Sequence, residues 1–82
     1  MDVESKLEFL LSNARESLAA LNTRDHSVRG LVDRIAALRY AEGTLIGFID
    51  ALAITDPQKA REIAPRVDAF VSEAIAARIL MD

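Results

Sequence analysis

Residues 39–57, RYAEGTLIGFIDALAITDP, decide how this chain folds. The large apolar side chains of this stretch recur at steps of three and four, which is the spacing that keeps side chains on one side of an α-helix. The same spacing extends backwards, so that one stripe runs through Val28, Leu31, Ile35, Leu38, Glu42, Leu45, Ile49 and Leu52. The pattern therefore predicts a long helix over residues 27–54.

The end of the quoted stretch predicts the start of a third helix over residues 57–81. Thr55 with Gln58 fits a capping box, and Asp56 before Pro57 fits an N-cap followed by proline at the first helical position. Its predicted buried face is Ala60, Ile63, Val67, Phe70, Val71, Ala74 and Met81. Pro65 predicts a kink or a break in this helix, because proline removes a backbone hydrogen bond.

Upstream of the long helix, the sequence predicts a first helix over residues 3–22 with Asp2 as its N-cap. Its stripe is Val3, Leu7, Leu10, Leu11, Ala14, Leu18 and Leu21. Turn-forming residues at 22–27 end it. The fold class is therefore all-α: one domain, residues 1–82, of three antiparallel helices with the second longest and central.

Composition argues against several classes of function. The net charge of −3 is unlike the basic field of most nucleic-acid-binding proteins. The chain has no cysteine, and His26 is its one histidine, so we expect no zinc site and no cofactor. No phosphate loop or nucleophile motif is present. We therefore expect a protein that is not an enzyme.

The start of the chain, MDVESKLEF, lacks the basic segment of a signal peptide. The longest apolar run, GTLIGF, is far shorter than the ~20 residues of a membrane span. We expect a soluble cytoplasmic protein with no membrane contact.

Glu42 falls inside the apolar stripe of the long helix, where a carboxylate needs a partner. Arg39 lies one turn earlier, and antiparallel packing of the first two helices brings Lys6 near. We expect a buried ion pair of Glu42 with Lys6 or Arg39. The antiparallel hairpin of the last two helices likewise suggests a contact between Arg78 and Asp33.

A second side of the long helix carries the small residues Gly43 and Gly47, which would permit close approach of another helix. Three aromatic side chains, Phe9, Tyr40 and Phe48, also miss the predicted stripes. Left-over aromatics are enriched at interfaces. These five residues form the candidate interface, with a rotated bundle that simply buries the aromatics as the alternative.

The apolar fraction, 51%, exceeds what one thin layer of three helices can bury. The leading hypothesis is therefore a small non-enzymatic interaction or regulatory protein that acts through protein–protein contacts as a homodimer, the dimer completing a helical bundle. A small dimeric helical regulator that binds nucleic acid is the alternative, and its test is a salt-sensitive mobility shift with RNA or DNA.

Overall fold

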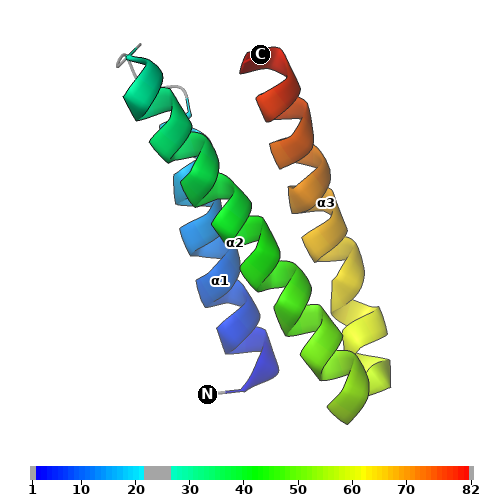
Figure 1. Ribbon diagram of the computed structural model, residues 1–82. Coiled ribbons are helices and arrows are strands. Elements are labelled where there is room, and N and C mark those ends of the chain that lie inside the picture. The colour runs from blue at the N-terminus through cyan, green and yellow to red at the C-terminus, as the bar shows by residue number, and fades with distance from the viewer. Residues whose placement is uncertain (1, 22–26, 82) are drawn as a thin grey trace.

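The computed structural model describes residues 2–21 and 27–81, with the side chains of residues 80 and 81 outside that description. It confirms an all-α fold of three helices: α1 (Val3–Ala20), α2 (Val28–Thr55) and α3 (Pro57–Met81). Each helix runs antiparallel to the one before it (Figure 1). The predicted turn at residues 22–26, which includes His26, and the side chain of Met81 lie outside the described part of the chain.

Each helix begins at a polar side chain that accepts a hydrogen bond from the first turn. Asp2 accepts from the backbone N–H of Ser5 at 2.7 Å, and Ser27 accepts from Gly30 at 3.0 Å. At the start of α3, Asp56 accepts from the N–H of Lys59 at 3.2 Å. Of the two start signals predicted there, the pairing of Asp56 with a proline at the first helical position is therefore the one used.

Pro65 does not break α3, which is one continuous helix from Pro57 to Met81. Proline has no N–H to donate to the carbonyl of Arg61, so one intrahelical hydrogen bond is missing. Ile63 and Val67, on either side of the proline, are both almost completely buried. Their packing holds both parts of the helix against the core, which explains why a break, one of the two predicted effects of Pro65, does not occur.

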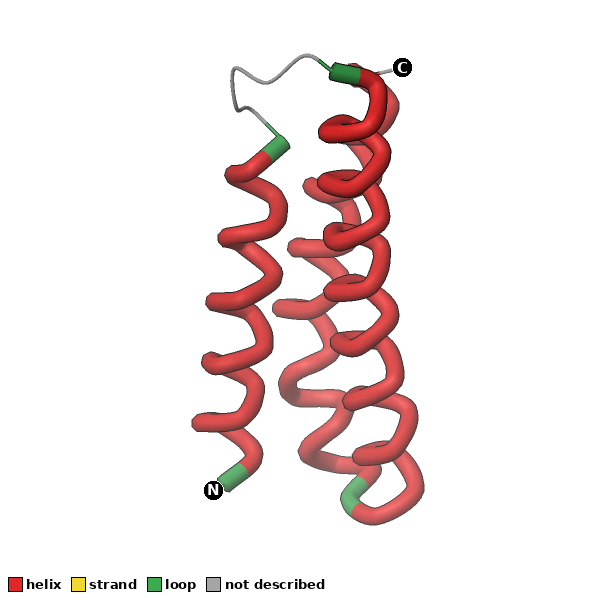
Figure 2. The backbone as a smooth tube through the Cα atoms, turned by 60° about the vertical axis from the view of Figure 1, so that its left-hand side comes forward, coloured by secondary structure: helices red, strands yellow, loops and turns green. Residues whose placement is uncertain are grey.

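The predicted stripes form the core. Figures 1 and 2 show the three helices running side by side along the long axis of the molecule. The buried apolar residues are Leu7, Leu11, Ala14, Leu21, Leu38, Leu45, Leu52, Ala60, Ile63, Val67, Phe70 and Ala74. Val28 is an exception to the prediction: it is 79% exposed, at the first position of α2.

The molecule is long and thin. Its principal extents are 43 × 23 × 15 Å and its radius of gyration is 13.8 Å, compared with about 12 Å expected for a compact chain of this length. Helix α2 packs against both neighbours, whereas α1 and α3 contact each other less extensively. Helix α2 is therefore central, but its neighbours cover only part of its circumference.

Charged side chains join α1 to α3. The two carboxylate oxygens of Glu4 form ion pairs with α3: one lies 2.8 Å from Nζ of Lys59, and the other lies 3.1 Å from a guanidinium nitrogen of Arg66. Arg66 also pairs with Glu8. These contacts are exposed, so each is a modest contribution to stability, but together they hold the two least-packed helices in register.

This cluster predicts a specific acid sensitivity. The hydrogen bond from Lys59, its charge and that of Arg66 hold the pKa of Glu4 below its ordinary value. A carboxyl whose pKa is lower in the folded state contributes stability that is present above its unfolded pKa and is lost as pH falls through its folded pKa. We expect the urea midpoint of Glu4→Gln to fall less than that of the wild type as the pH is lowered through the acid range, because the variant has no carboxylate here to protonate. Glu16→Gln, at an exposed position of the same helix, is the control. Equal acid sensitivity in both variants and the wild type would contradict this role of Glu4.

Candidate functional site

Helix α2 carries two seven-residue repeats, offset from each other by one residue. The first, which we call the inner stripe, is Leu31, Ile35, Leu38, Glu42, Leu45, Ile49 and Leu52. All of its members are buried or half-buried. The inner stripe is the side of α2 that packs against α1 and α3.

The second repeat, which we call the outer stripe, follows the same steps of four and three. It consists of Val32, Ala36, Arg39, Gly43, Ile46, Asp50 and Ala53, and all seven are exposed. An offset of one residue turns the stripe by about 100° around the helix axis. The outer stripe therefore forms a second, regular side of α2 that no other helix of this chain covers.

The glycines of the candidate interface lie in open space. A Cβ atom built on Gly43 or on Gly47 would meet no atom within 4 Å. Neither glycine is therefore required for packing within the chain, although each costs up to about 1 kcal/mol in helix stability relative to alanine. An open surface at this flank is what a close-approaching second helix would need.

The three aromatic candidates differ in their exposure to solvent. Tyr40 is 79% exposed and Phe9 is 57% exposed, so both remain available to a partner. Phe48 is half-buried and packs against the core cluster. For Phe48 the contact with the core agrees with the alternative of a rotated bundle, while its place in an interface stays a prediction.

Large apolar side chains are concentrated on the exposed surface of α2. Within the described residues, eight large apolar side chains are exposed, and five of them belong to α2: Val28, Val32, Tyr40, Ile46 and Ile54. Two more, Ile75 and Ile79, lie one turn apart on α3. A concentration of this kind is typical of an interaction surface rather than of the scattered apolar residues found on any protein.

The buried acid of the inner stripe has a different partner from the one predicted. Glu42 is 6% exposed and forms an ion pair with Arg78 of α3. Lys6 and Arg39 are exposed, and neither pairs with Glu42; Arg78 does not pair with Asp33. Arg39, one turn before Glu42, is exposed and forms no ion pair with it. The long side chain of Arg78, inside the apolar face of α3, reaches the carboxylate instead.

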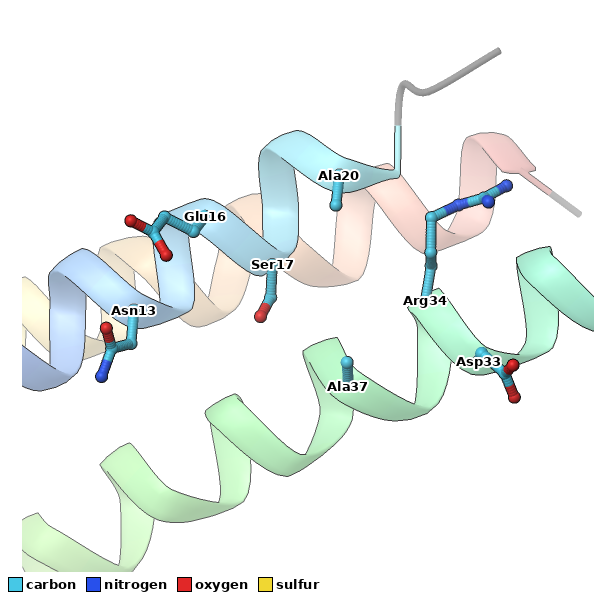
Figure 3. Close-up of a pocket in the computed structure, with 7 residues that line it drawn as sticks. All are labelled: Asn13, Glu16, Ser17, Ala20, Asp33, Arg34 and Ala37. Atoms are coloured by element: carbon cyan, nitrogen blue, oxygen red, sulfur yellow. The ribbon is translucent and has the colours of Figure 1, made fainter. Parts of the chain in front are cut away.

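A shallow depression of about 320 Å³ lies between α1 and α2. Figure 3 shows Asn13 and Ser17 pointing from α1 toward α2, whereas the carboxylates of Glu16 and Asp33 point in different directions. The polar groups do not converge on one point, and we assign no chemistry to this depression.

Across the described part of the chain, no three acidic, histidine or cysteine residues are grouped in a way that could hold a metal ion. No helix within the same residues has the length and apolar character to cross a membrane. Comparison of the chain with protein-family models, with curated proteins and with solved structures finds no match. The surface of α2 is therefore the feature from which a function can be argued.

Two features of α2 were not predicted from the sequence: the partner of Glu42 and the outer stripe. The pairing of Glu42 with Arg78 depends on the register of α3 against α2, which a one-residue error in the intervening turn would change. The outer stripe had a readable signal: each of its members follows one residue after a member of the inner stripe.

The ion pair predicts a large difference between two variants. We expect Arg78→Ala to lower the free energy of unfolding by about 3 kcal/mol, because it leaves the carboxylate of Glu42 buried without its counter-ion. The double variant Glu42→Leu, Arg78→Leu should lose less than about 1 kcal/mol, since two apolar side chains can replace a buried pair. Urea unfolding measures both, with Arg61→Ala on the exposed side of α3 as the control. If Arg78→Ala behaves like Arg61→Ala, the pair does not stabilise the fold.

Proposed function

We propose that this chain is a small non-enzymatic cytoplasmic protein that acts through protein–protein contacts and self-associates as a homodimer through the outer stripe of α2. One observation carries the proposal: a regular stripe that includes Val32, Gly43 and Ile46 is exposed along the helix. A helix exposed to water normally has a polar outer side. The outer side of α2 is instead mainly apolar or small, as expected of a helix with a second partner.

The size of the surface supports a dimer. The two larger extents of the molecule are 43 and 23 Å, so its broad side is on the order of 1,000 Å², comparable with the roughly 800 Å² per partner of a stable interface. Helix α2 packs against both other helices, and its exposed outer stripe contributes to the surface of the molecule.

The thinness of the fold supports the same proposal. A chain of 82 residues buries only about three-fifths of its unfolded surface when it folds alone. Small domains often add stability by oligomerisation. Burying Ile46, Val32 and Tyr40 against a second copy would extend the core without any change in the fold of the monomer.

The test is the mass of the protein in solution. We expect sedimentation equilibrium at tens of micromolar to give twice the monomer mass of 9.0 kDa. Ile46→Glu should reduce it to the monomer mass, because it places a charge in the centre of the apolar surface. Ala76→Glu, at an exposed position of α3, is the matched control and should remain dimeric. A wild-type protein with the monomer mass would overturn the proposal, and a dimer unaffected by Ile46→Glu would place the interface elsewhere.

A further inference from the structure

Two charged residues interrupt the outer stripe, and their positions are symmetric. The midpoint between Arg39 and Asp50 along the sequence falls between Thr44 and Leu45. The two charged residues therefore lie at equal distances on either side of this point. Both side chains are exposed, and neither forms an ion pair with another described residue. Opposite charges at equal distances from one point along a helix are complementary to the same helix turned end to end.

We propose that the dimer forms by antiparallel pairing of two α2 helices about a two-fold axis level with Thr44 and Leu45, with Arg39 of each copy paired to Asp50 of the other. This inference rests on the proposed function and adds to it the orientation and register of the interface. A two-fold axis makes every contact occur twice, so both charges of both copies are satisfied.

The same register fits the sizes of the remaining residues. It places Ile46 of one copy opposite Gly43 of the other, so that the largest apolar side chain at the centre meets open space. It also places Ala36 opposite Ala53. Small residues at these positions let two helix axes approach at the short end of the usual 8–10 Å range. Repeats of four and three are also the pattern of helices that pair along their length.

The flank of the stripe gives a further match. Tyr40 and Gly47 each lie one residue after a member of the outer stripe, on the same side of it. End-to-end pairing puts Tyr40 of each copy on the same flank as Gly47 of the other, about 3 Å apart along the helix axis. The side chain that is 79% exposed in the single chain then covers the flank position that has no side chain.

Parallel pairing of the same stripe is disfavoured by its charges. It would place Arg39 against Arg39 and Asp50 against Asp50 at the centre of the interface. Like charges facing each other in an interface cost several kcal/mol and exclude the wrong arrangement. The two charged residues therefore select the antiparallel orientation as well as the register.

Cysteine trapping tests the orientation directly, because the chain contains no cysteine of its own. Ala36→Cys and Ala53→Cys are prepared separately, mixed in equal amounts and oxidised. Trypsin leaves positions 36 and 53 in different peptides, 35–39 and 40–59, so mass spectrometry identifies each linkage. We expect 36–53 linkages. Linkage of position 36 to itself should be absent, since antiparallel pairing separates the two copies of this residue by about 25 Å along the axis, far beyond disulfide reach.

Three outcomes would overturn the inference, and they differ in what they leave standing. Linkage of 36 to 36, or a dimer mass with no linkage at all, overturns the antiparallel register while dimerisation stands. A wild-type protein with the monomer mass overturns both the inference and the proposed function.

Charge reversal tests the pairing of Arg39 with Asp50. We expect Arg39→Glu and Asp50→Arg each to weaken the dimer by about tenfold or more, because each creates two like-charged pairs. An equal mixture of the two variants should recover the affinity, since each mixed dimer again has two opposite-charged pairs. Arg61→Glu and Asp68→Arg, at exposed positions of α3, are the matched controls. Circular dichroism of all four variants checks that the helices are unchanged.

The alternative orientation predicts a different result. In a parallel dimer, Arg39→Glu replaces one like-charged pair by another and leaves the affinity unchanged. Unchanged affinity in either single variant, or a mixture that stays dissociated, would overturn the proposed pairing.

Discussion

Burial of the inner stripe of α2 between α1 and α3 is the interaction on which the rest of the structure depends. Leu38 and Leu45 are completely buried there, and Phe70 of α3 is the largest buried side chain in the core. Two flanking helices can cover only part of one helix, and α1 and α3 make limited contact with each other. The fold that follows is a thin layer, in which the central helix is buried on one side and exposed on the other.

A buried ion pair in this apolar core favours one register of α3 against α2. Apolar contacts are not directional, so they distinguish one register from another less sharply than a charged pair does. The pair between Glu42 and Arg78 forms in one register of α3 against α2. A shift would leave a charge buried without its partner, at a cost of several kcal/mol. Polar residues in an otherwise apolar face can in this way specify one arrangement among several of similar packing.

Much of the fold could be predicted from the sequence, because it depends on local signals. Helix periodicity, the capping side chain of Asp2 and the proline after Asp56 act over a few residues each, and the structure confirms them. The partner of Glu42 and the burial of Phe48 depend on how helices rotate and slide against one another. Such geometry is determined by the sum of many contacts between distant segments, and no short pattern encodes it. Pro65 shows the same limit, since core packing on both sides outweighs a local signal for a break.

The outer stripe is the part of the molecule that the fold leaves without a structural role. Its exposed isoleucine, open Gly43 and symmetric charges are explained together if a second copy of the chain covers it. The most direct test is the melting temperature of the wild-type protein at two concentrations, about 2 µM and about 200 µM, because only an associating protein has a concentration-dependent transition. The account predicts a rise of about 5 °C or more over this range. Identical melting temperatures at both concentrations would contradict it.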